Sequence, residues 1–464
     1  MEMTVAPAKL EGTIPIPGSK SHTIRALLIA SGTGGESVIH NPLLSADTEA
    51  CIAACETLGA RIGRSDDRLT VEGWGAKNRE AEATDTGRTD TASPSGGPST
   101  GSTDSAPTGA EIDVGNSGTT LYLTAGFTAL RNTPIVLTGD EQIRNRPIGP
   151  LLSSLCDLGA EAQSIHETGT APVMVRGPLR GGQTSIECPT SQYLSSLLLA
   201  CPLAAGDSVI SVPLLHERPY VEMTLSWLDG QHISYQAEPD FSRFTVPGRQ
   251  QYRPFERTIP GDFSSATFFL VAAAITGSTV VLSNLDMNDS QGDKQVVEIL
   301  RAMGCTISGG GKSRGSTDRG AGPTGPPDPP DQLIIEGNRL YGREIDLNTM
   351  PDALPALAVA GCFAEGETRL YNVAGARLKE TDRITVMREE LSKMGADIEE
   401  LPDGLLIRKR TLRGARVSGR GDHRVVMALA VAGLAASGET TIDTAESVSI
   451  TFPTFFSLLT EHRR

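Results

Sequence analysis

The amino-acid sequence predicts an α/β fold built from six copies of one unit, arranged as two domains of three units each. Three observations predict it. Five helical patterns close on a glycine and run into a strand-like segment, and six strand-like segments lead through a short polar loop into an Ala/Leu-rich helix. Once two polar insertions are subtracted, successive helix starts lie roughly 65 to 75 residues apart. A chain of 464 residues is long enough for two such domains.

The five glycines lie where a helix needs a left-handed residue in order to end. Glycine adopts that backbone conformation without the steric cost that a side chain adds. We therefore expect a helix to stop and a strand to follow at each of them. They are Gly59, Gly159, Gly230, Gly304 and Gly395.

The six loops that precede the apolar helices are rich in Gly, Ser, Asn and Asp. A helix start carries unpaired N–H groups and a partial positive charge, and it therefore attracts anions. If the six units share one architecture, these starts can converge on one anion-binding region. The loops are 17–21, 115–119, 189–192, 261–265, 350–353 and 421–424, and residues 257–262 are the candidate crossing point between the domains.

Two segments lack the composition of a packed core. Residues 81–109 contain no Val, Leu, Ile, Met or aromatic residue, and half of residues 308–331 are Gly or Pro. Such segments bury too little apolar area to offset the entropy of ordering. We expect mobile surface insertions over about 76–110 and 308–331.

Charge and apolar content exclude several classes of protein. The 56 acidic against 41 basic side chains give a net charge of −15, which argues against a nucleic-acid binder. No apolar run reaches the roughly 18 residues of a membrane helix, and the first residues do not resemble a signal peptide. Seven scattered cysteines without a CxxC pair indicate small core residues of a reducing cytoplasm. We expect a cytoplasmic protein with no membrane or nucleic-acid partner.

Cationic and acidic side chains cluster at three of the predicted helix starts. Lys20, Ser21 and Arg25 lie together at one helix start, with Arg25 one turn beyond Ser21 on the same face. The spacing around them is not that of a nucleotide-binding P-loop. Arg146 lies just before a proline that suits a first helical turn, and its planar guanidinium matches phosphate or carboxylate. Residues 379–383 gather five polar side chains. Taken alone, a pair such as Lys20 and Arg25 is more often simply solvated, and residues 379–383 fit an exposed helix cap with a salt bridge as well as a functional site.

Histidines carry little functional signal in this sequence. His423 opens the last apolar helix, and no second histidine stands at a metal-ligand spacing from it. We expect all seven histidines to be structural residues that make hydrogen bonds, and we expect no metal site.

The chain resembles the 5-enolpyruvylshikimate-3-phosphate synthase family over nearly its whole length outside the two insertions. Nine motifs in the right order carry the resemblance. They are PGSKSHTIRALLIA (17–30), GNSGTT (115–120), IRNRPIG (143–149), TSQYLSSLLLACPL (190–203), RPYVEMT (218–224), GDFSSATFFLVAAAI (261–275), MPDALPALA (350–358), RLKETDRI (377–384) and GDHRVVMALA (421–430).

The resemblance implies a two-domain inside-out α/β barrel of the enolpyruvyl transferase type. Each domain holds three βαβαββ units with the helices inside the sheets, and a double hinge joins residues 19–259 to a discontinuous domain of 1–18 and 260–464. The implied reaction transfers the enolpyruvyl group of phosphoenolpyruvate to the 5-hydroxyl of 3-phosphoshikimate, releasing phosphate, in chorismate and aromatic amino-acid biosynthesis. No metal or organic cofactor is implied, and we expect a monomer.

The resemblance also implies roles for individual residues. Those implied to bind 3-phosphoshikimate are Lys20, Ser21, Arg25, Thr190, Ser191, Gln192, Tyr220, Asp352 and Lys379. Those implied to bind phosphoenolpyruvate are Lys20, Gly118, Arg146, Gln192, Arg383 and Arg424. The implied acid and base groups are Asp352, Lys379 and Glu380, with Glu380 acting on C3 of the donor, and the exchange of roles between Asp352 and Lys379 stays open. The two substrates bring about six negative charges when fully ionised, and six cations in these sets are available to balance them.

Four positions depart from the family pattern. The family commonly has Arg at Tyr122, Ser at Glu217, Asn at Gly375 and Lys at Ile450. These departures bear on the contacts to the acceptor and on the C-terminal edge of the donor site.

Two other functions are considered. One is the sister transferase that acts on UDP-N-acetylglucosamine, which uses a loop cysteine as proton donor. Residues 141–147 contain no cysteine. The other is a catalytically inactive relative that serves as a scaffold or anion sensor, against which the intact Asp352, Lys379 and Glu380 argue.

Overall fold

The structure is a computed structural model that describes residues 1–65, 67–75, 110–309 and 332–464. Most of the two expected insertions therefore lies outside the described residues. Three residues assigned to them do not. Ala110 begins a strand, and Ser308 and Gly309 end another, so at these positions the expectation of insertion residues was wrong.

In the part of the chain that the structure describes, the strands form six sheets. Three sheets come from the middle of the chain: β14 (Glu256–Thr258), β3 (Glu36–His40), β5 (Arg68–Glu72) and β4 (Arg61–Ser65); β6 (Ala110–Asp113), β7 (Ile135–Thr138), β9 (Val173–Arg176) and β8 (Glu161–Ser164); β10 (Gly182–Cys188), β11 (Ser208–Leu215), β13 (Arg243–Val246) and β12 (Gln236–Ala237). One sheet comes from the later part of the chain alone: β18 (Glu344–Asp346), β19 (Glu367–Tyr371), β21 (Gly404–Arg408) and β20 (Asp397–Leu401). Two combine this part with a strand from the start of the chain: β16 (Thr306–Gly309), β17 (Gln332–Glu336), β15 (Thr279–Ser283) and β2 (Glu11–Pro15); β1 (Met3–Val5), β23 (Thr440–Asp443) and β22 (Arg416–Ser418).

One pairing scheme recurs in these sheets and confirms the sixfold repeat. Each four-stranded sheet has one parallel pair, such as β6 with β7, followed by two antiparallel pairs, such as β7 with β9 and β9 with β8. The three-stranded sheet has the parallel pair β22 with β23 and a single antiparallel pair.

Six apolar helices are buried over nearly their whole length and form the inner helices, whereas the other α-helices are buried only in part. The inner helices are α1 (Lys20–Ser31), α4 (Gly118–Thr128), α6 (Ser191–Ala200), α8 (Phe263–Thr276), α10 (Leu354–Phe363) and α12 (His423–Ala435). The others are α2 (Ala46–Thr57), α5 (Gly149–Asp157), α7 (Arg218–Gly230), α9 (Gln295–Met303), α11 (Arg383–Lys393) and α13 (Phe455–Glu461), with 3₁₀ helices η1 (Ile143–Asn145), η2 (Cys201–Leu203), η3 (Gly292–Lys294), η4 (Pro351–Ala353), η5 (Ala374–Leu378) and η6 (Ala445–Ile450). Helix α8 is buried on all sides from Phe263 to Ala274, as a helix surrounded by protein must be.

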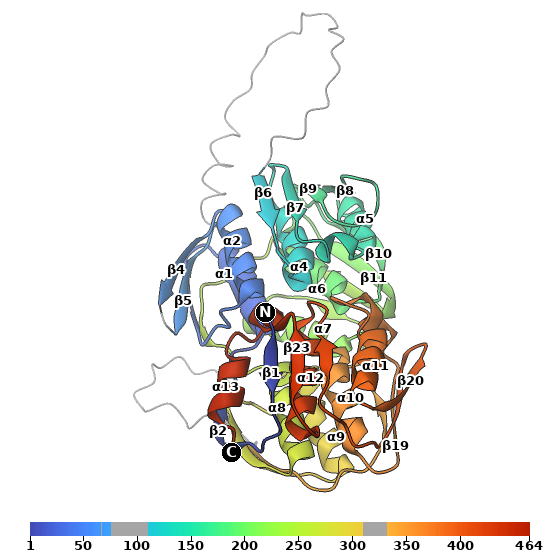
Figure 1. Cartoon of the computed structure of the whole chain (residues 1–464). Coiled ribbons are helices and arrows are strands. Elements are labelled where there is room, and N and C mark those ends of the chain that lie inside the picture. Colours follow the sequence, from blue (N-terminus) through green and yellow to red (C-terminus); the bar gives the residue numbers. More distant parts are fainter. Residues whose placement is uncertain (66, 76–109, 310–331) are drawn as a thin grey trace, which may run out of the picture.

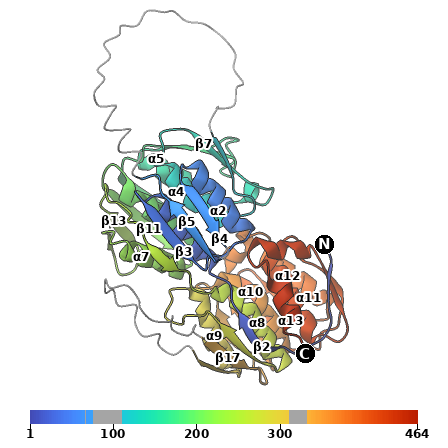
Figure 2. The same cartoon turned by 90° about the vertical axis from the view of Figure 1, so that its left-hand side faces the viewer.

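Two separate hydrophobic cores divide the molecule. One holds Ile24 to Ile259, and the other holds residues from Phe263 to Leu459 together with Val5 to Ile16. Figures 1 and 2 show the two bodies, one coloured blue to green and the other yellow to red together with the blue strands β1 and β2. We name residues 19–259 the N-terminal half and residues 1–18 with 260–464 the C-terminal half. These boundaries stay a prediction, which the two cores support.

The chain passes between the halves at two adjacent segments. Gly18 forms an antiparallel bridge with Gly261. A Cβ atom on Gly18 would lie 2.1 Å from the carbonyl oxygen of Asn41, and one on Gly261 would lie 2.0 Å from that of Asn284. Both crossings therefore require glycine, and they use equivalent contacts.

Four of the five predicted helix-ending glycines are confirmed. Gly59, Gly159, Gly304 and Gly395 have φ values of +106°, +92°, +121° and +91°. The prediction for Gly230 was wrong, because α7 includes it and the left-handed residue comes two positions later, at His232.

Two further expectations concern the cysteines, predicted as small core residues, and the helices, predicted not to span a membrane. All seven cysteines are free thiols, and six are buried, whereas Cys156 is exposed. Among the described residues, no helix is long and apolar enough to cross a bilayer.

Candidate active site

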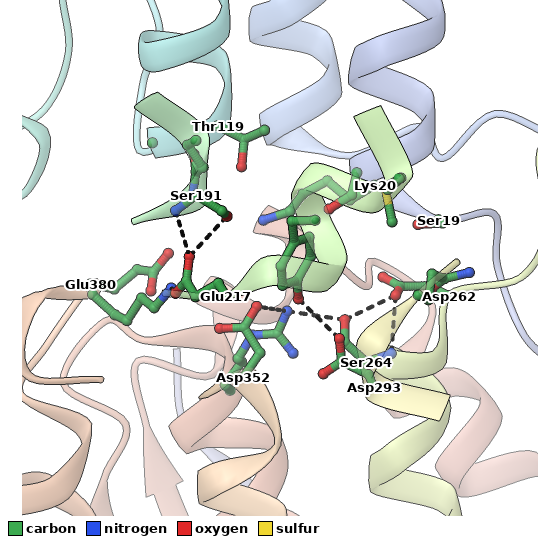
Figure 3. A pocket seen from close by; sticks show the side chains of 18 of the residues that line it. Ser19, Lys20, Thr119, Ser191, Glu217, Asp262, Ser264, Asp293, Asp352 and Glu380 are labelled. Atoms are coloured by element: carbon green, nitrogen blue, oxygen red, sulfur yellow. Dashed lines mark hydrogen bonds and ion pairs between the residues drawn. The ribbon is translucent and has the colours of Figure 1, made fainter. Parts of the chain in front are cut away.

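One cavity between the two halves collects the predicted residues. Five of the six inner helices reach its wall at their starts, and α10 reaches it through Asp352 of the preceding 3₁₀ helix η4, as the repeat predicted. Thirteen of the fourteen predicted residues line it: Lys20, Ser21, Arg25, Gly118, Arg146, Ser191, Gln192, Tyr220, Asp352, Lys379, Glu380, Arg383 and Arg424. In Figure 3, Lys20 and Ser191 enter from one side, and Asp352 and Glu380 from the other.

The N-terminal half supplies a buried guanidinium that is held by uncharged groups. Arg25 is 1% exposed, and its Nε donates to Thr224 Oγ1 at 3.0 Å while its Nη2 donates to the Tyr220 carbonyl oxygen at 3.1 Å. Burial lowers the pKa of Arg25 to about 10, which still leaves it charged at neutral pH. A buried cation on neutral partners is ready to receive an anionic group.

Gly118 and Arg146 fit tightly against each other in the same half. A Cβ atom at Gly118 would lie 2.2 Å from Nη1 of Arg146, so any side chain there would displace the guanidinium. Arg146 Nη2 lies 3.1 Å from Glu380 Oε1 of the other half. Lys20 is paired as well, with its Nζ 2.8 Å from Asp47 Oδ2.

The C-terminal half holds a network of carboxylates around two arginines. Arg383 donates from Nε to Asp422 Oδ2 and from Nη1 to Asp352 Oδ1, both at 2.8 Å, and it also pairs with Glu380. Arg424 Nη2 lies 3.0 Å from the second oxygen of Asp352. Each carboxylate is thus shared with or adjacent to a guanidinium.

These contacts set the protonation states of the acid and base groups. Burial alone raises the pKa of Asp352, but Arg424, Lys379 and Arg383 bring it well below its ordinary range. Burial also opposes ionisation of Glu380, but Arg383 and Arg146 lower its pKa well below the usual value. Both groups are therefore carboxylates in the ligand-free site.

Lys379 closes the cavity beside a carboxylate from the other half. Its Nζ donates to Glu217 Oε1 at 2.7 Å. Burial would lower the pKa of Lys379, yet Glu217 and Asp352 raise it above the ordinary lysine value, so the amine is protonated. The other oxygen of Glu217 accepts hydrogen bonds from Thr190 and Ser191. We name the donors on Thr190, Ser191 and Lys379 the α6 anion site.

Sequence reasoning gave no site role to several residues of the wall, among them Glu217, Asp262, Ser264 and Asp293, although it noted Glu217 as a departure from the family pattern. Asp262 and Ser264 stand in the loop 261–265, which gave a usable signal. No sequence signal identified Asp293, because its properties depend on its burial in the folded protein. That burial, with the nearby Asp352, raises the pKa of Asp293 to about 7, and Tyr220 Oη donates to its Oδ2 at 2.9 Å.

The prediction that His423 makes structural hydrogen bonds was wrong. Its side chain lines the cavity, and neither buried ring nitrogen has a hydrogen-bond partner among the described residues. Burial lowers the pKa of His423 well below its usual value, so the ring is neutral.

The excess of basic over acidic side chains around the cavity is also smaller than the sequence suggested. Six lysines and arginines line the cavity, but so do the five carboxylates of Glu217, Asp262, Asp293, Asp352 and Glu380. Asp352 and Glu380 were predicted members of the site, whereas the other three acids come from segments to which the sequence analysis gave no acidic role.

The remaining predicted residue and three departures lie at an adjoining cavity. Thr190 lines that cavity together with Tyr122, Glu217 and Gly375. Tyr122 donates its hydroxyl to the Pro147 carbonyl oxygen at 3.1 Å. The fourth departure, Ile450, ends η6 and lies outside the lining of both cavities.

Comparison with known proteins agrees with this arrangement. The family model described as EPSP synthase (3-phosphoshikimate 1-carboxyvinyltransferase) matches residues 5–93 and 90–459. The chain is 50% identical to a 3-phosphoshikimate 1-carboxyvinyltransferase of Acetivibrio thermocellus, covering 99% of this chain and 97% of the relative. It is 42% identical to a protein of the same name from Methanocella arvoryzae, covering 96% and 95%.

Solved structures give the same result for the fold. An EPSP synthase from Acinetobacter baumannii superimposes with a TM-score of 0.77 at 28% identity, covering 100% of this chain and 98% of that one. The nine ordered motifs, the sixfold repeat and the shared cavity are thus accompanied by full-length similarity in sequence and structure. The chain belongs to the EPSP synthase (3-phosphoshikimate 1-carboxyvinyltransferase) family.

Proposed function

We propose that this chain transfers the enolpyruvyl group of phosphoenolpyruvate to the 5-hydroxyl of 3-phosphoshikimate and releases inorganic phosphate. The observation that carries the proposal is one cavity in which cations and hydroxyls of the N-terminal half face carboxylates and further cations of the C-terminal half. The full-length similarity to proteins named for this reaction supports it. A monomeric state and a cytoplasmic location stay predictions.

The acceptor binds mainly to the N-terminal half in this proposal. Arg25 and Ser21 bind the carboxylate and ring of 3-phosphoshikimate, and Tyr220 packs against it. Thr190 and Ser191 donate to its phosphate, as the start of α6 favours an anion there. Gln192 lies between the two ligands, and its buried Oε1 has no partner within the described residues.

The donor binds between the halves. Arg146 from one side and Arg383 and Arg424 from the other hold the carboxylate and phosphate of phosphoenolpyruvate, with Lys20 close to both ligands. Planar guanidiniums suit this task because each can donate two parallel hydrogen bonds to an oxyanion. Gly118 leaves the space that Arg146 needs.

Bond formation at C2 of the donor requires proton transfers at two atoms. The acceptor oxygen loses its proton as it bonds to C2, and C3 gains a proton. Phosphate then leaves C2, and C3 releases a proton to restore the double bond. Asp352, ionised in the free site, suits acceptance of the hydroxyl proton, while protonated Lys379 orients that oxygen.

Glu380 is our candidate for the C3 proton. In the free site it is a carboxylate because Arg383 and Arg146 lie beside it. When the anionic donor binds these two arginines, their stabilisation of the carboxylate weakens and the pKa of Glu380 rises. Donor binding therefore prepares the acid that the reaction needs.

A phosphate-release assay with different acceptors tests the proposal. Phosphoenolpyruvate is supplied with 3-phosphoshikimate, with UDP-N-acetylglucosamine or with no acceptor. We expect phosphate only with 3-phosphoshikimate. Release with the nucleotide sugar would assign the sister activity, and no release under any condition would indicate an inactive relative.

A further inference from the structure

The carboxylate of Glu217 fills the α6 anion site. Glu217 is 5% exposed, and its Oε2 accepts from Thr190 Oγ1 at 3.2 Å, from Ser191 N at 3.3 Å and from Ser191 Oγ at 3.1 Å. Its Oε1 accepts from Lys379 Nζ at 2.7 Å. Figure 3 shows this side chain reaching the start of α6. Four donors around one carboxylate form a complete site for an oxyanion.

The backbone of Glu217 indicates that this placement is specific. The residue has φ +57°, a left-handed conformation that L side chains other than Asn and Asp seldom adopt. It precedes the first turn of α7, but its side chain makes no capping hydrogen bond to that helix. The side chain turns instead to the N-terminus of a different helix, α6.

We propose that Glu217 is a resident anion that holds the α6 anion site until 3-phosphoshikimate binds, and that its displacement sets the affinity for the phosphorylated acceptor. This inference rests on the proposed function, in which these donors receive the acceptor's phosphate. A carboxylate and a phosphate cannot share four donors, because both only accept hydrogen bonds when ionised and their charges repel. Binding also frees Lys379, which Glu217 otherwise engages.

The structure provides space for the displaced side chain. Glu217 and Gly375 together line two further cavities beside the active site. A Cβ atom on Gly375 would meet only the Pro189 carbonyl oxygen, at 3.8 Å, so the position is open. The absence of a side chain at Gly375 leaves room into which the Glu217 carboxylate can move.

Calorimetric titration of Glu217→Ser and Glu217→Gln with 3-phosphoshikimate and with shikimate tests the proposal. In Glu217→Ser we expect the Kd for 3-phosphoshikimate to fall about 10-fold or more, because a like charge has gone, and that for shikimate to stay within about twofold. Glu217→Gln keeps the shape and should give a smaller gain of the same sign. The matched control is Glu222→Gln in helix α7, which Glu217 directly precedes. It removes an exposed carboxylate and should change neither Kd.

An unchanged or weaker affinity of both Glu217 variants for 3-phosphoshikimate would overturn the proposal, provided that both retain the wild-type melting temperature. An equal gain for shikimate would also overturn it, because the effect would not depend on phosphate. Loss of the proposed function is recognised separately. In that case the wild type itself releases no phosphate, whereas failure of this inference alone leaves wild-type turnover intact.

A double-mutant cycle tests the displaced position. Gly375→Asn should raise the Kd for 3-phosphoshikimate about three- to tenfold in the wild-type background, because it fills the space that Glu217 needs. In the Glu217→Ser background the same substitution should have little effect. Equal effects in both backgrounds would contradict the assignment of this space.

Discussion

The two halves of the molecule share one repeated unit, yet they present different chemistry to the same cavity. In the N-terminal half, Arg25 is held by uncharged oxygens and the start of α6 offers hydroxyls. In the C-terminal half, Arg383 is surrounded by the carboxylates of Asp352, Glu380 and Asp422. The N-terminal wall therefore offers Arg25 and the donors of the α6 anion site, which Glu217 occupies in the free protein. The C-terminal wall holds the groups assigned to proton transfer together with two arginines assigned to the donor.

This difference shows that the repeated backbone and the individual side chains have different functions in the site. Helix starts attract anions in every unit, because that property belongs to the backbone. Proton transfer needs ionisable groups, and these lie on the C-terminal side. Ion pairs between Arg146 and Glu380 and between Glu217 and Lys379 bridge the halves, so the complete site exists only where both meet.

The largest expected effect lies in the C-terminal half. Glu380→Gln keeps the shape of the side chain but removes the group assigned to the C3 proton. We expect kcat to fall about 10²–10⁴-fold. Steady-state assays of phosphate release measure the change, and near-normal turnover would remove Glu380 from this role.

We expect substitution of Arg383 to lower the free energy of unfolding much more than substitution of Arg25. Arg383→Met removes the shared cation of Asp352, Glu380 and Asp422, of which Asp422 is fully buried. We expect this to lower the free energy of unfolding by about 3–5 kcal/mol. Arg25→Met leaves only neutral partners and should cost about 1 kcal/mol. Urea denaturation of both variants provides the comparison. Equal losses would show that the two walls do not differ in this way.

The fit between Gly118 and Arg146 predicts a more modest effect on donor binding. Gly118→Ala places a methyl group on the guanidinium, which must move away from the cavity. We expect the KM for phosphoenolpyruvate to rise about 10-fold, the loss of roughly one charge-assisted hydrogen bond. The KM for 3-phosphoshikimate, measured in the same assay, should change much less. An unchanged donor KM would mean that Arg146 does not hold the donor.

The smallest effect concerns pH and Asp293. Its pKa of about 7 in the folded protein lies above the ordinary 3.8, so between these values the folded state binds more protons than the unfolded state. This group therefore lowers the stability as the pH rises from about 4 to about 7, and not beyond. Relative to wild type, Asp293→Asn should gain about 1 kcal/mol or more in unfolding free energy between pH 5 and pH 8. Parallel pH profiles in urea would contradict the raised pKa.

Local signals in the sequence were sufficient to predict the repeat and most of the predicted residues that line the central cavity, whose roles stay predictions. Helix starts, glycine closures and the nine motifs are each encoded within a few residues, so they were visible without coordinates. Helix α7 was the exception, because it continues through Gly230 and turns at His232.

Features that depend on distant contacts were not predictable from the sequence. Glu217 meets Lys379 across 162 positions of the chain, and no local pattern indicates that pairing. The raised pKa of Asp293 follows from burial beside Asp352, which only the folded arrangement produces. The neutral, unpartnered ring of His423 is a further case of this kind.

Calorimetric titration of 3-phosphoshikimate into wild type, Arg25→Met and Glu380→Gln tests the division of work between the halves most directly. We predict that Arg25→Met weakens binding about 10-fold or more, while Glu380→Gln binds within about threefold of wild type although its turnover has collapsed. If Glu380→Gln loses as much acceptor affinity as Arg25→Met, binding and proton transfer are not divided between the two walls, and the central claim is contradicted.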